Sequence, residues 1–184
     1  AFKSSSITTI IIPKTVQTIG TQVFETCLNL GSVTWNSTES TIRESIFKGC
    51  KSLTSFTIPG TIKTIDTQAF ATSGLTTIEI KEKVTTIKTE AFARCESLET
   101  IKYPVSVTNG SPDMFKESNN IHTLTIYGIE GNTEMKSYEI DQQPWNSIKK
   151  NEKFKTIIIE EGVTTIGGNA FQGVTKINSL TIPN

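Results

Sequence analysis

A phenylalanine returns along this chain at an almost constant interval. The marker positions are Phe24, Phe47, Phe70, Phe92, Phe115 and Phe171. Successive markers differ in number by 23 (24 to 47), 23 (47 to 70), 22 (70 to 92), 23 (92 to 115) and 56 (115 to 171). A fixed period in the twenties predicts a solenoid, in which each repeat forms one coil and stacks on the next. The last difference equals one further regular period of 23 plus an expanded one of 33.

Each repeat contains three apolar clusters, which are clearest in residues 51–73. The first, residues 53–58, ends in an apolar, polar, apolar alternation that predicts a half-buried strand. The second, residues 62–65, has an isoleucine at each end, and the third, residues 69–73, carries Phe70 and ends on a small residue. One repeat is too short to bury all three clusters, so the stacked coils must bury them in one continuous column.

Short polar signals mark the ends of these segments. Pro59 follows the predicted strand, and a residue without an N–H cannot continue a strand ladder. Thr67 precedes Phe70 by three residues and is predicted to cap a short helical turn that carries this phenylalanine. The equivalent threonines of two other repeats are Thr21 and Thr89.

Two repeats depart from the second cluster. Glu39 stands where an apolar residue is expected, and Gly110 stands where isoleucine is expected. We therefore expect the second strand to be weak or absent in residues 36–43 and in residues 105–112.

The repeats resemble the BspA-like, or Treponema-type, leucine-rich repeat family, whose pattern is L-x-x-L-x-L-P-x-x-V-x-x-I-x-x-x-A-F-x-x-C. Residues 51–73, 156–174 and 176–184 follow this pattern closely, and the likeness covers essentially all 184 residues. It implies a strand-dominated leucine-rich-repeat solenoid of about eight coils, each of roughly 22–23 residues, with one expanded irregular coil. It further implies a parallel β-sheet on the concave side, and second short strands and short helical turns elsewhere. The implied role is surface-exposed binding, often in adhesion to host organisms.

The domain prediction is a single leucine-rich-repeat domain over residues 1–184, with an irregular insert at about 127–153. Neither end shows a polar capping coil, so we expect a fragment of a longer array. The insert resembles an irregular coil of the family, in which Met135, Tyr138 and Trp145 are the large apolar residues. Large apolar side chains usually lie inside, which favours a local plug over a protruding binding loop.

Composition and motifs argue against several function classes. The 18 basic and 18 acidic residues balance, and no basic stripe predicts a nucleic-acid partner. No apolar run is long enough for membrane insertion within this segment. The single histidine, His122, has no Ser, Asp or Cys at a fixed repeat position beside it, so we expect a solvent-facing residue and no enzyme activity. No cofactor motif is present.

Three cysteines occupy the small position that ends the third cluster. Cys27, Cys50 and Cys95 share this position with Ser73 and other small residues, which indicates free, buried thiols. The spacing does not fit a zinc site. A Cys27–Cys50 disulfide is the alternative if the protein is secreted.

The outward positions of the predicted strands form the candidate binding surface. One of them is always Ser or Thr, which predicts a hydroxyl ladder along the sheet: Thr9, Ser32, Ser55, Thr77, Thr100, Thr123, Thr156 and Ser179. Charged and aromatic residues gather beside it in neighbouring coils, where they could give the concave face specificity. These candidate ligand-binding residues are Glu79, Lys81, Glu99, Lys102, His122 and Tyr127.

We therefore expect a non-catalytic protein-interaction or adhesion module, located at the cell surface or secreted. Its partners would be proteins or extracellular-matrix ligands. Two N-x-[ST] sequences, at Asn36 and Asn109, are compatible with a secretory route. An intracellular protein-interaction scaffold on the same repeat is the alternative, since three unpaired cysteines suit a reducing compartment.

Overall fold

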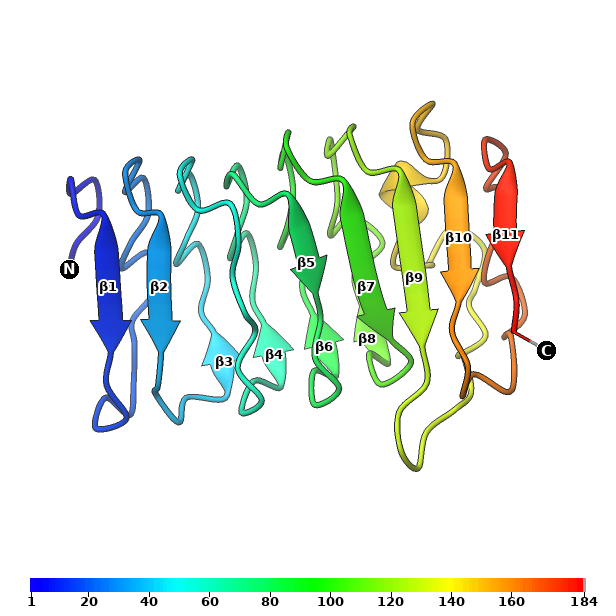
Figure 1. Ribbon diagram of the computed structural model, residues 1–184, viewed down its shortest axis with the longest axis horizontal. Coiled ribbons are helices and arrows are strands. Elements are labelled where there is room, and N and C mark those ends of the chain that lie inside the picture. The colour runs from blue at the N-terminus through cyan, green and yellow to red at the C-terminus, as the bar shows by residue number, and fades with distance from the viewer. Residues whose placement is uncertain (184) are drawn as a thin grey trace.

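The computed structural model describes residues 1–183 as a rod of stacked coils, with the two ends of the chain at opposite ends of the rod (Figure 1). Each coil but one contributes a strand to a long-strand row along one side. This row consists of β1 (Thr9–Ile12), β2 (Ser32–Trp35), β5 (Thr77–Glu79), β7 (Thr100–Pro104), β9 (Thr123–Tyr127), β10 (Thr156–Ile159) and β11 (Ser179–Thr181).

A second, short-strand row runs beside the first and covers the middle of the rod. Its members are β3 (Thr41–Ile42), β4 (Thr64–Ile65), β6 (Thr86–Ile87) and β8 (Asn109–Gly110). Neighbouring strands are parallel in both rows. The described residues contain one helical element, the 3-10 helix η1 (Asn146–Ile148). The predicted strand-dominated solenoid is therefore confirmed.

The register of the long-strand row aligns the predicted hydroxyls. Thr77 lies opposite Thr100, Thr100 opposite Thr123, and Thr123 opposite Thr156. The inward residues of the same strands are buried, as the alternation predicts. The exposed side of this row is called the long-strand face below.

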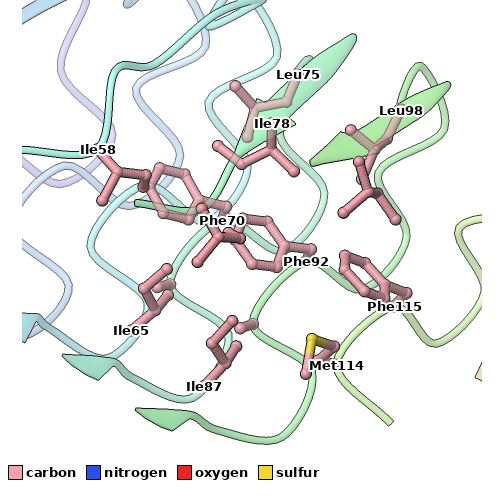
Figure 2. Packing of buried hydrophobic residues seen from close by; sticks show 14 of the residues in the cluster. Ile58, Ile65, Phe70, Leu75, Ile78, Ile87, Phe92, Leu98, Met114 and Phe115 are labelled. Atoms are coloured by element: carbon pink, nitrogen blue, oxygen red, sulfur yellow. The ribbon is translucent and has the colours of Figure 1, made fainter. Parts of the chain in front are cut away.

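A stack of phenylalanine rings forms the centre of the column. Phe70 lies 5.4 Å from Phe47 and 5.3 Å from Phe92, measured between ring centroids, and both neighbouring rings are close to parallel with it. At one end the stack continues to Phe115. At the other end Phe2 stacks on Phe24 and adds a ring that was not among the marker phenylalanines. Figure 2 shows Phe70, Phe92 and Phe115 in sequence, surrounded by aliphatic residues of both strand rows.

The cysteine position supplies a hydrogen-bond donor, which the sequence did not reveal. The Cys50 thiol lies 3.1 Å from the carbonyl oxygen of Phe24, and the Cys95 thiol lies 3.2 Å from that of Phe70. In another coil the Ser118 hydroxyl donates to the carbonyl of Phe92 at 2.7 Å. Each of these side chains thus binds the marker phenylalanine of an earlier coil, which explains why Cys and Ser interchange.

The three cysteines are free and buried, as the preferred interpretation predicts. Burial raises the pKa of the Cys50 thiol to about 12 and that of Cys95 to about 11. Both thiols therefore stay protonated at neutral pH, and a protonated thiol is a poor nucleophile.

Replacing Cys95 tests this role of the thiol. We expect Cys95→Ser to change the free energy of unfolding by less than about 1 kcal/mol, because a hydroxyl can still donate to the Phe70 carbonyl. Cys95→Val removes this donor and leaves the Phe70 carbonyl bound by the N–H of Ser73, so we expect a loss about 0.5–1.5 kcal/mol larger than that of Cys95→Ser. Urea unfolding of the two variants measures the difference, and an equal effect of both substitutions would contradict a donor role.

The prediction that the second strand is weak or absent in two repeats is wrong. β3 and β8 are as long as β4 and β6. β3 forms because its own residues, Thr41 and Ile42, pair normally with Thr64 and Ile65, and Glu39 lies outside the strand. The Glu39 carboxylate instead accepts the N–H of Ile19 at 3.0 Å.

Gly110 has a different explanation. A Cβ added there would lie 2.5 Å from the Tyr103 hydroxyl, so the tyrosine ring fills the space that an isoleucine side chain would need. The backbone of Gly110 still pairs with that of Ile87, because ladder hydrogen bonds do not require a side chain.

Three predicted strands are missing, one of them at residues 163–166, where only an isolated bridge forms at Thr165. Residues 53–58 form no strand, although their sequence is close to the pattern. The inward position that holds Ile, Val or Leu in the other coils is Phe56 here, and its ring packs 5.2 Å from both Phe47 and Phe70. We attribute the interrupted row to this larger side chain. The first coil also lacks its second strand, since the N–H of Ile19 binds Glu39.

The segments that carry the marker phenylalanines are turns rather than the predicted helical turns. Gln68 and Thr72 have φ angles of 54° and 56°, and two left-handed residues four positions apart cannot belong to one helix. The same pair recurs at Glu90 and Arg94, with φ angles of 55° and 53°. Thr67 therefore caps no helix.

The irregular insert folds inward, as predicted. Met135 and Trp145 are buried, and Tyr138 packs against the core. Trp145 stacks on Phe171 at 5.3 Å between ring centroids and donates its indole N–H to the carbonyl of Ala170 at 2.7 Å. The plug interpretation is confirmed, and Trp145 provides the aromatic ring that the expanded coil would otherwise lack.

Candidate binding face

Four of the six predicted binding residues lie together on the long-strand face. Glu79 belongs to β5 and lies directly opposite Lys102 of β7 in the strand register. Lys81 follows β5 and forms an ion pair with Glu79 at 2.7 Å. Tyr127 ends β9, and the ammonium of Lys102 lies 5.0 Å from the centre of its ring.

The hydroxyl of Tyr127 reaches across an intervening coil. It donates to the carbonyl of Ile80 at 2.6 Å, while β9 and β5 are separated in the sheet by β7. Burial, together with the negative charges of Glu79, Glu82 and Glu160, raises the pKa of Tyr127 to about 12. The phenol therefore remains a hydrogen-bond donor at neutral pH, and its ring is held in one orientation.

Glu160 completes this cluster and was missed by sequence analysis. Its carboxylate pairs with the ammonium of Lys102 at 2.9 Å. Glu160 follows Ile159 as Lys81 follows Ile80, so the two occupy the same place in their repeats. Comparing that repeat position between coils could have identified it. We call Glu79, Lys81, Lys102, Tyr127 and Glu160 the Tyr127 cluster.

Glu99 and His122 form a separate pair near the starts of β7 and β9. His122 Nε2 lies 3.7 Å from the Glu99 carboxylate, and His122 Nδ1 lies 3.0 Å from the Thr123 hydroxyl. Glu99 and Lys102 are three positions apart along the strand, which corresponds to about 10 Å. The prediction that His122 is exposed to solvent is confirmed.

The long-strand face presents charged groups, hydrogen-bond donors and hydrogen-bond acceptors. The charged groups of the Tyr127 cluster are paired and held on adjacent strands, so they present a fixed pattern. Across residues 1–183 no group of three His, Cys, Asp or Glu side chains is arranged to hold a metal ion. In the same residues no helix has the length and apolar character needed to cross a membrane.

Two hollows lie near the strands. One, of about 200 Å³, opens on the long-strand face between residues 55–58 and β5. The other, of about 360 Å³, is apolar and lies in the first coil against Phe2, Ile11 and Phe24, apart from the Tyr127 cluster.

Comparison with solved structures supports the fold. A leucine-rich repeat protein from Bacteroides ovatus superposes with a TM-score of 0.56 at 20% identity, covering 96% of this chain and 67% of that one. A leucine-rich repeat protein from Eubacterium ventriosum gives a TM-score of 0.56 at 24% identity, covering 97% of this chain and 50% of that one. A leucine-rich cell surface protein from Faecalibacterium prausnitzii gives a TM-score of 0.39 at 19% identity, covering 95% of this chain and 79% of that one, a likeness too low to bear on the fold. The chain thus spans about half to two thirds of the length of the first two proteins.

Sequence comparison identifies the family. No curated protein matches the chain. The model of the BspA type leucine rich repeat region matches six copies, over residues 1–122 and 132–184. The unmatched residues 123–131 contain β9 and the start of the irregular insert. Because the match covers nearly the whole chain, in agreement with the coils and their phenylalanine stack, the protein belongs to the BspA-type leucine-rich repeat family.

Proposed function

We propose that this chain is a non-catalytic binding module of a cell-surface or secreted protein, and that it binds protein or extracellular-matrix partners through the long-strand face. The observation that carries the proposal is the Tyr127 cluster. It presents an aromatic ring, two ammonium groups and two carboxylates from four coils in one arrangement. Aromatic and charged side chains on a rigid surface are typical of residues that dominate protein recognition. Membership of a repeat family that forms interaction surfaces supports the same role.

The cluster is prearranged, which favours binding. Lys102 is held between Glu160 and the Tyr127 ring, and Tyr127 is anchored to Ile80. Ordering flexible side chains on association opposes binding, and side chains already ordered in the free protein avoid most of that loss. We propose that Glu99 and His122 form a second contact at the other end of the same strands.

Reversing two charges of the cluster tests the proposed function. Glu79→Arg with Lys102→Glu turns the two ion pairs of the cluster, with Lys81 and with Glu160, into contacts between like charges. Because these pairs are partly exposed and such pairs contribute little, we expect the free energy of unfolding to fall by no more than about 1 kcal/mol. The unaltered chain is first screened against a panel of purified extracellular-matrix and serum proteins to find one that it binds. The affinity of the double variant for that protein should be lower by roughly tenfold or more, since a mismatched charge opposes association. Surface plasmon resonance measures the affinity.

A control variant also reverses one acidic and one basic residue of neighbouring coils, at an exposed ion pair outside the Tyr127 cluster. Arg94 and Glu117 lie in the turn segments and pair at 2.8 Å. Arg94→Glu with Glu117→Arg should leave binding unchanged. Equal loss in both double variants, or unchanged binding in the first, would contradict the proposed site.

The proposed location depends on the full-length sequence. A signal peptide or a membrane anchor in the flanking segments would support a cell-surface or secreted protein, and complete flanks with neither would contradict it. An intracellular scaffold was suggested by the unpaired cysteines. The structure gives these thiols a hydrogen-bonding role that a serine also fills, so their unpaired state favours neither compartment.

A further inference from the structure

The long-strand row is open at the third coil while the rod behind it remains closed. Residues 55–58 form no strand, so β2 and β5 have no partner between them. The short-strand row is continuous at this level, because β4 pairs with both β3 and β6. The result is a hollow of about 200 Å³ that opens on the long-strand face and is closed behind.

Aromatic packing forms the floor of this hollow. The Phe56 ring packs 5.2 Å from Phe47 and from Phe70, and edge-on to Trp35 at 6.3 Å. At one end the N–H of Thr76 donates to the carbonyl of Thr54 at 3.0 Å. The opening is therefore fixed by the core and needs no rearrangement to accept a ligand.

The rim of the hollow is polar and balanced in charge. It consists of the hydroxyls of Ser55, Thr57 and Thr77 and the ion pair of Glu79 with Lys81. Within the described chain, the backbone groups of residues 55–58 make no backbone hydrogen bond. The rim thus offers both donors and acceptors, and its two charged side chains sum to no net charge.

We propose that this hollow binds one neutral sugar ring, either free or at the end of a glycan. Drug-sized ligands occupy pockets of about 300–1,000 Å³, so a hollow of about 200 Å³ suits a single small ring. Each sugar hydroxyl both donates and accepts, which matches a rim of hydroxyls, a carboxylate, an ammonium and backbone groups. The paired charges of Glu79 and Lys81 favour a neutral ligand over an ionised one. The inference rests on the binding role proposed above, because these two residues belong to both sites.

Titration with simple glycosides tests the proposal. The probes are the methyl glycosides of glucose, mannose, galactose and fucose, with glucuronic acid as the charged comparison. We expect at least one neutral glycoside to shift the amide NMR signals of residues 54–58 and 76–81, with a dissociation constant in the millimolar range because the ligand is small. No shift at these amides with any neutral glycoside, or a shift with glucuronic acid alone, would overturn the proposal.

Matched variants locate the site. Thr57→Val and Thr77→Val keep the branched shape of the side chain and remove one hydroxyl each, so each should weaken binding about fivefold or more. Thr34→Val and Thr125→Val make the same change at the position of Thr57 in other coils and should leave binding unchanged. Equal effects in all four variants would place the ligand elsewhere and overturn the proposal.

The two proposals can fail separately. Lys102 and Tyr127 do not line the hollow, so Lys102→Glu should weaken macromolecular binding and leave glycoside binding unchanged. If the unaltered chain binds a macromolecular partner but no neutral glycoside shifts its amide signals, only the proposed sugar site is overturned. Unchanged macromolecular binding in the Glu79→Arg with Lys102→Glu variant would contradict only the proposed function.

Discussion

Replacing Phe70 by alanine should lower the free energy of unfolding by about 3–5 kcal/mol, the range for removing a fully buried phenylalanine. Phe70 is fully buried and contacts aromatic rings on three sides, namely Phe47, Phe56 and Phe92, at centroid distances of 5.2–5.4 Å. The substitution removes the transfer free energy of the ring and leaves a cavity that these neighbours can fill only in part. Urea unfolding monitored by circular dichroism measures the loss.

The end of the same stack provides the control. Phe2 stacks on Phe24 alone and is 46% exposed. Phe2→Ala should therefore destabilise the protein by less than about 1.5 kcal/mol, because much of its surface already contacts water. A loss under about 1 kcal/mol for Phe70→Ala would show that the ring stack does not support the column.

Introducing isoleucine at Gly110 should destabilise the rod by about 3 kcal/mol, and a second substitution should recover much of that loss. A Cβ at Gly110 would lie 2.5 Å from the Tyr103 hydroxyl and 2.9 Å from the Met114 Cε. Tyr103 is itself buried, and its hydroxyl has no hydrogen-bond partner within the described chain, so it has little room to move. Substitutions into full cores destabilise because side chains must leave their preferred rotamers.

Tyr103→Ile restores the residue type that other coils carry at this position. We expect the double variant Tyr103→Ile with Gly110→Ile to be more stable than the sum of the single effects predicts, by roughly 1–3 kcal/mol. A double-mutant cycle from urea unfolding measures this coupling. Gly60→Ala is the control, because a Cβ there has no neighbour within 4 Å. Additive single effects would show that Tyr103 does not occupy the space of the missing side chain.

The repeated features of the fold could be predicted from the sequence. Each marker phenylalanine has the same surroundings in successive coils, so a single periodic pattern predicts the stack around Phe70. The hydroxyl ladder is equally predictable, because Thr77, Thr100 and Thr123 share one position and one register. Features of this kind depend on a residue and its copy in the next coil, and the sequence contains both.

The departures from the repeat could not be predicted in this way. Each depends on a contact between residues at different repeat positions, and a periodic pattern gives no information on such contacts. Gly110 is accommodated by Tyr103, from the strand before it, and Glu39 binds the N–H of Ile19 in the preceding coil. Phe56 interrupts a strand whose other residues fit the pattern. In the Tyr127 cluster, Glu79 and Lys102 share one repeat position, whereas Glu160 shares its position with Lys81 and Tyr127 and reaches Lys102 across the intervening coil of β9. Side-chain size and reach decide these contacts.

The two strand rows are interrupted at different coils, and this affects how the rod carries load. Where the long-strand row opens at the third coil, β3, β4 and β6 still join the second, third and fourth coils. Where the short-strand row ends after β8, the pairing of β7, β9, β10 and β11 continues to the last coil. Every junction between adjacent coils is therefore crossed by at least one parallel ladder. A pulling force along the axis loads these junctions in series, so the two-residue ladders of β4 with β3 and with β6 are expected to set the load at which the rod opens.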